Sequence, residues 1–377
     1  MASSTKAKNV RRGAERETER RTGRRRLSRQ ERQKRRRRKL AAMLAVEFVL
    51  LLILGVGVWG ISKLDKIQDL GVNKKDITIN DMDDATEEVL KGYTNIALFG
   101  IDTREVGELG AGNRSDTIMI ASINNDTKKV KLVSVYRDTY MNRGDDTYWR
   151  CNEAYARGGP AQAMNMLNTN LDLNIQYFVS VDFMALIKTI DLLGGIEVDV
   201  QEEEWEWVNA YMLETTYITQ QYGKTLDGPG LQTLYGLQAT SFCRIRATAG
   251  SDFRRTERQQ MVLKLIAEKA KKSSLGTINS IIDEVFPLIA TNIPKTEMLS
   301  MAASMMSYEM GETGGFPTML ENVQINGAKM LAPADLEANV RELHRFLFDE
   351  DDYYPSPTVL KYSEQISADT GVYSSEE

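Results

Sequence analysis

The alternation of apolar and polar positions predicts strands and helices that follow one another from residue 95 onward. Short apolar runs bounded by turn residues indicate buried strands at 95–100, 117–123, 130–136, 176–181, 196–200 and 323–325. Apolar residues at helical spacing predict helices at 160–171, 183–193, 256–272, 277–290, 296–306 and 333–348. This order, with one hairpin across residues 124–126, predicts an α/β fold: a three-layer α/β/α domain with a central mixed sheet.

The longest apolar run covers residues 40–62 and is interrupted only by Glu47. At a rise of about 1.5 Å per residue, a helix of this length can span a hydrocarbon core of about 30 Å. Residues 1–39 carry 18 Lys and Arg against 4 Asp and Glu. The positive-inside rule therefore predicts a single-pass protein of the cell membrane, with a cytoplasmic N-terminus and an extracellular C-terminal domain. A cleaved signal peptide fits less well, because the basic region is long and no A-x-A site follows the apolar run.

Composition divides the chain into five segments, and the part after residue 39 is acidic, with 30 Lys and Arg against 49 Asp and Glu. The basic N-terminal segment could neutralise nucleic-acid phosphates, but the apolar run that follows it favours a topogenic role. The predicted segments are a disordered cytoplasmic segment 1–39, a transmembrane helix 40–62, a linker or stalk 63–91, a folded extracellular domain 92–348 and an acidic disordered tail 349–377.

Cysteine and histidine are scarce. Cys151 and Cys243 are the only cysteines, so one extracellular disulfide is conceivable, but no CxxC metal motif exists. His344 is the single histidine and lies far along the chain from the charged clusters described next. Zinc sites rich in histidine and histidine-based catalytic triads are therefore disfavoured.

Residues 201–230 form a less regular, aromatic-rich insertion. Its aromatic side chains could line a groove for sugar or lipid, or they could be packed inside the domain. They are Trp205, Trp207, Tyr211, Tyr217 and Tyr222.

The stretch 242–260 holds five arginines and no lysine. Arg244 and Arg246 are two residues apart, so on a strand both side chains would leave the same face. Asp252 can cap a following helix whose first turns carry further arginines. Strand-end arginines beside a helix N-terminus suit a phosphate or pyrophosphate.

Three other charged clusters flank predicted strands. Asp102 follows the first strand, Arg114 and Asp116 precede the second, and Arg137 follows the third. Each cluster alone could be an ordinary solvated ion pair, but 11 of the 13 arginines after residue 39 lie between residues 104 and 258. Arginine gives bidentate contacts to phosphate oxygens, and neighbouring carboxylates can hold Mg²⁺. Together these residues favour phosphoryl chemistry.

Six stretches of the chain resemble, in order and spacing, the LytR–CpsA–Psr (LCP) proteins of Gram-positive-type cell envelopes. They are NIALFGIDTR, NRSDTIMIASIN, KKVKLVSVYRDTY, CNEAYARGGP, FVSVDFMALIKTIDLLGGIEVDV and CRIRATAGSDFRRTERQQ. The resemblance covers about residues 93–262, with looser similarity to about residue 348. Departures such as Tyr136, where members of the family often have proline, remove no charged site residue.

The resemblance implies an LCP-like fold and a Mg²⁺-dependent phosphotransferase. Such an enzyme moves an anionic glycopolymer, of the teichoic-acid or capsular type, from a polyprenyl-pyrophosphate carrier to a sugar hydroxyl of peptidoglycan. Polyprenyl phosphate is released, and a pyrophosphatase side reaction would use the same site. The expected partners are the lipid-linked glycopolymer, peptidoglycan and the membrane, with no nucleic acid.

Carried over by motif, Asp102 and Asp116 would bind Mg²⁺ (or Mn²⁺), and Arg137 would stabilise charge in the transition state. The residues expected to bind the pyrophosphate are Arg114, Arg137, Arg244, Arg246, Arg255 and Gln259, with Asp252 as an orienting acid. Capping its own helix is an equally consistent role for Asp252. Two other functions stay open: a non-catalytic protein that binds polyprenyl phosphate in envelope assembly, and a membrane-bound transcriptional regulator.

Overall fold

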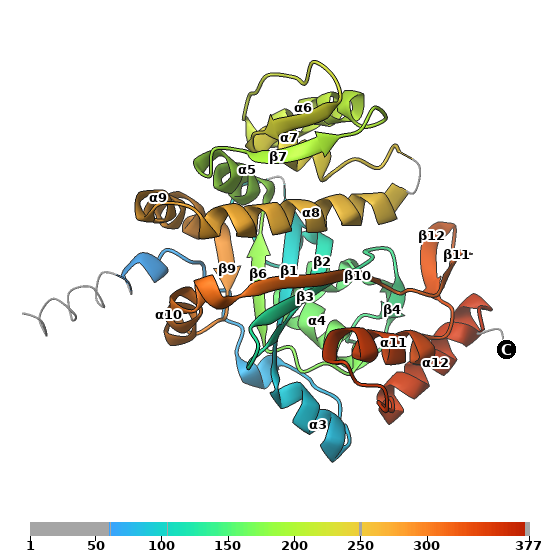
Figure 1. Cartoon of the computed structure of the whole chain (residues 1–377). Helices are drawn as coiled ribbons and strands as arrows, with labels where there is room; N and C mark the ends of the chain where they lie inside the picture. Colours follow the sequence, from blue (N-terminus) through green and yellow to red (C-terminus); the bar gives the residue numbers. More distant parts are fainter. Residues whose placement is uncertain (1–59, 61, 104, 249–250, 374–377) are drawn as a thin grey trace, which may run out of the picture. The chain divides into compact units, whose positions relative to one another are not determined.

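A computed structural model describes residues 60, 62–103, 105–248 and 251–373 (Figure 1). The chain divides into two compact units, Met1–Gly60 and Ile61–Glu377, and the fold described below is that of the second. The predicted segment 1–39 and the predicted membrane helix 40–62, apart from Gly60 and Ser62, lie outside the described residues. Within the described ranges, no helix has both the length and the apolar character needed to cross a bilayer.

A six-stranded sheet forms the centre of the domain, with strand order β10-β3-β2-β1-β6-β9. Its strands are β1 (Tyr93–Asp102), β2 (Arg114–Asn124), β3 (Lys129–Val135), β6 (Tyr177–Val181), β9 (Ile289–Thr291) and β10 (Glu309–Phe316). Pairs β1–β2, β2–β3 and β6–β9 are antiparallel, whereas β1–β6 and β3–β10 are parallel. The predicted α/β fold with a central mixed sheet is confirmed.

Helices cover both faces of this sheet, because successive side chains along each strand point to opposite faces. On one face, Phe99 and Ile118 pack in a core with α4 (Glu153–Leu171) and α11 (Leu336–Phe348). On the other face, Ile96 and Leu132 pack against side chains of α8 (Ser251–Lys271) and α10 (Lys295–Ala303). The described domain therefore has three α/β/α layers (Figure 1).

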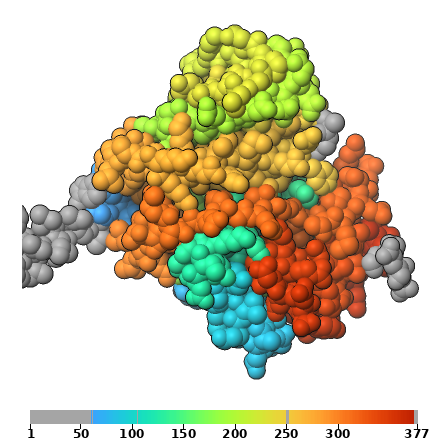
Figure 2. Space-filling view, in the orientation of Figure 1, coloured from blue at the N-terminus to red at the C-terminus, as the bar shows by residue number. Residues whose placement is uncertain are grey.

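A second, smaller core forms a cap that packs on α8. The cap is the yellow-green mass at the top of Figure 2. The cap consists of α5 (Phe183–Leu192), β7 (Ile196–Val200), α6 (Trp205–Thr219), β8 (Gly230–Leu234) and α7 (Gly236–Phe242). Asp182 caps α5 as predicted, since its side chain accepts a hydrogen bond from the Ala185 N–H. In the aromatic-rich insertion, Trp205 and Tyr211 pack on the cap core, whereas Trp207, Tyr217 and Tyr222 are exposed.

The remaining elements connect these layers. They are η1 (Lys74–Asp76), α3 (Asp84–Lys91), the pair β4 (Tyr140–Asn142) and β5 (Tyr148–Arg150), α9 (Leu275–Val285), η2 (Phe286–Leu288), η3 (Met305–Ser307), the pair β11 (Leu320–Ile325) and β12 (Ala328–Pro333), and α12 (Pro357–Thr370). The helix predicted from residue 160 begins earlier, at Glu153, with a kink at Gly158 and Gly159.

Residues 63–91 are part of the folded domain and do not form the predicted stalk. Leu64 and Leu90 are buried, and Gln68 forms a parallel bridge with Ala290 of β9. The segment is polar overall, but its few apolar side chains are spaced so that they reach the domain core.

The prediction of a disordered tail from residue 349 is wrong for the described residues, because α12 packs on the domain. Val359, Tyr362 and Ile366 are buried and follow one another at helical spacing. Asp172 holds the preceding loop, since its carboxylate accepts hydrogen bonds from the Tyr353 hydroxyl and the Ser356 N–H. Acidic composition had concealed this apolar stripe.

The two cysteines are free and buried, so the disulfide left open by the sequence is not formed. His344 is a packed residue: its ring stacks on Tyr353, with centroids 3.6 Å apart, and its Nε2 lies 3.0 Å from the Leu171 carbonyl oxygen.

Candidate functional site

Arg244 and Arg246 lie in a turn and loop after α7, and not on a strand as predicted. Ile245 between them is buried in the cap core, which sends the two flanking side chains in different directions. Arg244 reaches α6, whereas Arg246 reaches Asp116 at the start of β2. The two guanidinium groups thus face different parts of the site.

An alternating series of charges joins β2, β3 and α8. Asp116 Oδ2 lies 2.6 Å from Arg137 Nη1 and 3.5 Å from Arg246 Nη2. Asp252 Oδ1 lies 3.6 Å from Arg246 Nε and 3.2 Å from Arg255 Nη2. Asp138 also lies 3.6 Å from Arg137 Nε and 3.4 Å from Arg150 Nε, so four guanidinium groups share three carboxylates. This leaves an excess of positive charge that suits an anionic ligand.

Arg255 is the most buried member of this series, with 4% of its surface exposed. Burial lowers its pKa to about 10, although Asp252 acts in the opposite direction. Its Nε has no hydrogen-bond partner among the described residues. A buried donor without a partner is costly, so the group is prepared for an acceptor such as a phosphate oxygen.

Arg137 is also largely buried, and its Nε likewise lacks a hydrogen-bond partner in the described part of the chain. Burial acts to lower the pKa of Arg137, but the charges of Asp116, Asp138 and Asp252 more than offset this and raise it. Arg137 therefore keeps its charge inside the site.

Arg244 is oriented by residues that sequence reasoning missed. Its guanidinium donates to Thr215 Oγ1 and Glu214 Oε1, both at 2.9 Å, and lies over the Phe183 ring at 4.8 Å. Glu214 and Thr215 belong to the irregular insertion, about 30 residues earlier in the chain. Local spacing could not have paired them with Arg244.

Asp102 lies at the end of β1, paired with Arg114 in the register of β1 and β2. It keeps an exposed surface, but neighbouring protein atoms displace part of the water around its carboxyl. This desolvation, followed by the negative charge of Asp116, raises the pKa of Asp102. The charges of the two carboxylates are close enough to repel each other.

This repulsion is relevant to the predicted metal site. In the part of the chain that the structure describes, no three His, Cys, Asp or Glu side chains gather as a metal-binding group. Mg²⁺ commonly combines one or two carboxylates with phosphate and water oxygens. Asp102 and Asp116 fit a cation whose other ligands come from a bound phosphate and from water.

Arg114 and Gln259 lie apart from the charge series. Arg114 is largely exposed, and its Nη2 lies 3.3 Å from Glu153 Oε1. The Glu153 carboxylate also pairs with Arg143. Gln259 donates to the Cys243 carbonyl at 3.3 Å and lines the cavity described below. The structure therefore brings together Arg137, Arg246, Arg255, Asp116 and Asp252, with Asp102 and Arg244 beside them.

Arg258 has a structural position that the sequence did not reveal. It is 3% exposed, and its Nε donates to Glu204 Oε1 at 2.8 Å. Its two terminal nitrogens donate to the Ile245 carbonyl at 3.1 Å and to Thr248 Oγ1 at 2.7 Å. Arg258 thus fixes the loop that carries Arg244 and Arg246. Arg254, by contrast, is exposed and pairs with Glu257.

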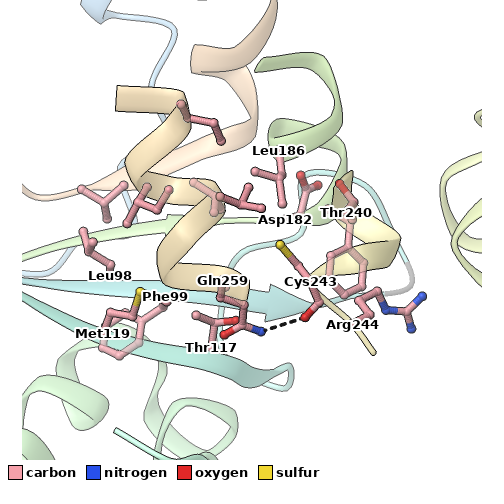
Figure 3. A pocket seen from close by; sticks show the side chains of 17 residues that line it. Leu98, Phe99, Thr117, Met119, Asp182, Leu186, Thr240, Cys243, Arg244 and Gln259 are labelled. Atoms are coloured by element: carbon pink, nitrogen blue, oxygen red, sulfur yellow. Dashed lines mark hydrogen bonds between the residues drawn. The ribbon is translucent and has the colours of Figure 1, made fainter. Parts of the chain in front are cut away.

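An apolar cavity of about 210 Å³ opens beside these charges, between the sheet, α5, α7 and α8 (Figure 3). Apolar side chains form most of its wall, among them Leu98, Met119, Leu186, Val262, Leu263 and Ile266. Its polar lining residues are Thr117, Asp182, Thr240, Arg244 and Gln259. At Gly100, which also lines the cavity, a Cβ would lie 2.8 Å from the Thr117 Cβ, so the two strands approach closely.

The chemistry of the site follows from the apolar cavity and from the charged cluster beside it. The cavity can hold a hydrocarbon chain, because water is readily displaced from an apolar wall. The adjoining arginines can bind phosphate oxygens, and Asp102 and Asp116 can add a divalent cation. An amphipathic ligand with an apolar tail and a phosphate head matches both parts.

Comparison with known proteins finds a matching family and related structures. Residues 61–342 match the model of the LytR_cpsA_psr family. The polyisoprenyl-teichoic acid–peptidoglycan teichoic acid transferase TagU of Enterococcus faecalis is 31% identical over 211 residues, covering 55% of this chain and 64% of that protein. The transferase TagT of Bacillus subtilis, whose name states the same reaction, is 29% identical over 213 residues, covering 56% and 63%. The chain therefore spans a little less than two thirds of the length of these relatives.

The solved structure of TagT bound to LI-WTA has the same fold, with a TM-score of 0.51 at 21% identity. The similarity covers 78% of this chain and 95% of that one. Since the family model matches well over half of its residues, the chain belongs to the LytR_cpsA_psr family.

Proposed function

We propose that the protein is a phosphotransferase that attaches an anionic cell-wall glycopolymer to peptidoglycan at the outer face of the cell membrane. The donor would be the glycopolymer linked to a polyprenyl-pyrophosphate carrier. One observation carries this proposal: an apolar cavity of about 210 Å³ adjoins a cluster of arginines and carboxylates. The names of TagU and TagT support the reaction, and the solved complex of TagT with LI-WTA supports a wall-teichoic-acid type of polymer.

In this reaction a sugar hydroxyl oxygen of peptidoglycan forms a bond to the phosphorus that carries the glycopolymer. The bond from that phosphorus to the bridging pyrophosphate oxygen breaks, and polyprenyl phosphate leaves with the electron pair. The hydroxyl proton is released to the leaving phosphate or to water. The product is a phosphodiester between glycopolymer and peptidoglycan.

Phosphoryl transfer depends on positioning of the reactants and on charge stabilisation. In this chain the arginines of the site would provide most of both. Arg246 and Arg255 would hold the pyrophosphate oxygens. Arg137 would stabilise the charge that develops during transfer, in a pocket where its own charge is retained. Asp102 and Asp116 would hold Mg²⁺ or Mn²⁺, which supplies positive charge on the pyrophosphate.

The donor class can be tested directly by mass spectrometry of lipid extracted from the purified full-length protein. We expect polyprenyl phosphate or pyrophosphate to co-purify with the wild type and to be lost from Arg255→Ala. Arg254→Ala is a matched control, because Arg254 lies next to it on α8 but is exposed and outside the charge series. Retention of the same lipid by Arg255→Ala would contradict the binding role.

The reaction itself requires a transfer assay with lipid-linked glycopolymer and peptidoglycan. Arg137→Ala and Asp116→Ala should lower transfer at least about 100-fold, in the range typical for loss of one charge-stabilising group. Undiminished transfer by both variants would overturn these roles. A wild type that retains the lipid but transfers nothing would instead identify a non-catalytic lipid-phosphate-binding protein.

A further inference from the structure

One side of the cap helix α6 borders the charged site. Arg244, which lines the apolar cavity, donates to Glu214 Oε1 at 2.9 Å, and its guanidinium carbon lies 5.9 Å from the centre of the Tyr211 ring. Trp207, Tyr211 and Glu214 recur at helical spacing, so they lie along the same side of α6. We call these three residues the α6 strip. From Glu214 it continues away from Arg244 for about 10 Å, at a rise of about 1.5 Å per residue.

Glu214 also lies close to the carboxylates of the site. The pKa of Asp102 is raised by desolvation first, then by Asp116, and further by the negative charge of Glu214. The Glu214 side chain is 59% exposed, and among the described residues only its Oε1 has a hydrogen-bond partner. Its other oxygen can therefore accept a hydrogen bond from a hydroxyl group of a ligand.

The aromatic residues of the α6 strip are open to solvent. Trp207 is 42% exposed, and Tyr211 is half-buried against the cap core. Aromatic rings beside a carboxylate suit a sugar chain, because the C–H face of a sugar packs on an aromatic face while its hydroxyls donate to the carboxylate. A single exposed aromatic residue would need no explanation. Here two of them, in successive turns, lead to the arginine cluster.

The charge of the cap decides which sugar chain fits the strip. Residues 197–214 include seven acidic residues, and the chain has no lysine or arginine between Lys188 and Lys224. Glu204 is bound to Arg258 inside the fold. The other six carboxylates are exposed: Glu197, Asp199, Glu202, Glu203, Glu206 and Glu214. This surface repels an anionic glycopolymer and anionic lipid head groups, but not an uncharged sugar chain.

We propose that the α6 strip is the acceptor subsite, and that a glycan strand of peptidoglycan lies along it with one hydroxyl held by Glu214. The inference rests on the proposed function and deepens it, because it names the part of the protein that binds the second substrate. The donor would fill the apolar cavity and the arginine cluster, so the acceptor must approach from a side that both leave open. Glu214 meets this requirement, since it contacts Arg244 from the exposed surface of the cap.

Glycan binding can be measured without catalysis. The probe is a soluble chitin oligosaccharide, which is uncharged, and the readout is saturation-transfer NMR on the full-length protein. The test variants are Trp207→Ala and Glu214→Gln. Their matched controls are Tyr217→Ala and Glu206→Gln. Both control residues are exposed, and their spacing places them on the side of α6 opposite its buried residues.

We expect Trp207→Ala and Glu214→Gln to reduce saturation transfer to the oligosaccharide several-fold, and both controls to leave it unchanged. Trp207→Tyr should restore most of the binding, because an aromatic face is retained. In the transfer assay, the two test variants should raise the KM for peptidoglycan several-fold while the KM for the donor stays nearly unchanged. Absence of saturation transfer from the wild type would overturn the inference. Equal losses in Trp207→Ala and Tyr217→Ala would also overturn it, because any exposed aromatic residue would then bind the sugar.

The co-purified lipid separates this role from the support of Arg244. A Glu214→Gln protein that loses its lipid but keeps normal saturation transfer would contradict the inference, because Glu214 would then serve only Arg244. A rise in the donor KM alone would contradict it too, since the strip would then hold the donor polymer. Failure of the proposed function gives a different result: the wild type would bind the oligosaccharide through the strip but transfer nothing. Normal transfer and normal sugar binding by both test variants would contradict the acceptor subsite alone.

Discussion

Arg258 and Arg254 are four residues apart on α8, but their environments differ completely. The Arg258–Glu204 pair is buried, and the same guanidinium holds the loop that carries Arg244 and Arg246. Arg254 is 57% exposed and pairs with Glu257. Arg254 is therefore a surface charge, whereas Arg258 supports the loop from inside the fold.

Replacement of Arg258 by methionine should therefore destabilise the fold by about 3–5 kcal/mol, because the Glu204 carboxylate would remain buried without its partner. Arg254→Met should change stability by no more than about 0.5 kcal/mol. Urea unfolding of the two variants measures this difference. The Arg258→Met protein should also lose bound lipid, and equal stability of the two variants would disprove the bracing role.

Asp102 gives a pH-dependent prediction. The pKa of Asp102 is raised in the folded protein. The folded protein therefore keeps the Asp102 proton at pH values above 3.8, the ordinary pKa at which the unfolded chain releases it. Stability is therefore lost as pH rises from 3.8 through the raised pKa, and the loss persists at neutral pH. Asp102→Asn should raise Tm at neutral pH but not well below pH 3.8. Asp126→Asn, in an exposed turn, is the control.

The same residue allows a metal test. Mg²⁺ should raise the Tm of the wild type, because it relieves the repulsion between Asp102 and Asp116. EDTA should reverse the shift, and Asp102→Asn should show a smaller one. An identical Mg²⁺ response in the variant would mean that the cation binds elsewhere.

At the scale of elements, α7 depends on a close approach to α5. A Cβ on Gly236 would lie 2.2 Å from the Ile187 carbonyl oxygen, which belongs to the α5 backbone. The two helices could not keep this contact, and overpacking of this kind costs about 1–3 kcal/mol. Since α7 leads into the turn that holds Arg244, its displacement would also disturb the site.

We expect Gly236→Ala to lower the unfolding free energy by that amount and to weaken lipid retention. Gly228→Ala is the control, because a Cβ there meets no heavy atom within 4 Å. Denaturant unfolding and lipid mass spectrometry of both variants provide the measurement. A Gly236→Ala protein as stable as Gly228→Ala would show that α5 and α7 can separate without cost.

The elements also show why part of the structure was predictable. Strands β2 and β3 were found because each is rich in apolar residues and a turn sequence lies between them. The strand expected at Arg244–Arg246 was wrong, because two charges around one isoleucine also describe a turn whose middle residue is buried. The charged residues at the ends of β1, β2 and β3 lie close together because these strands are neighbours in the sheet. The alternation of apolar and polar residues along the chain already predicted these three successive strands.

At the scale of the whole molecule, segment boundaries were the weakest predictions. Average composition placed 63–91 and 349–377 outside the domain, although a few well-spaced apolar residues bring much of both into it. The partners of these residues, such as Asp172 for Tyr353, are far away in the sequence. A composition count cannot register one buried contact between distant segments.

The bridge between Gln68 and Ala290 has a consequence for where the domain can be cut. β9 is the last strand of the sheet, and residues around Gln68 cover its open edge with backbone hydrogen bonds. A protease or a truncation that removes the chain through Gln68 would expose unpaired N–H and C=O groups of β9, and such edges join to one another. We expect a fragment that starts at Asp69 to self-associate in sedimentation velocity, and one that starts at Ser62 to stay monomeric. The few residues after the predicted membrane helix would then decide whether the isolated C-terminal domain survives as a soluble protein.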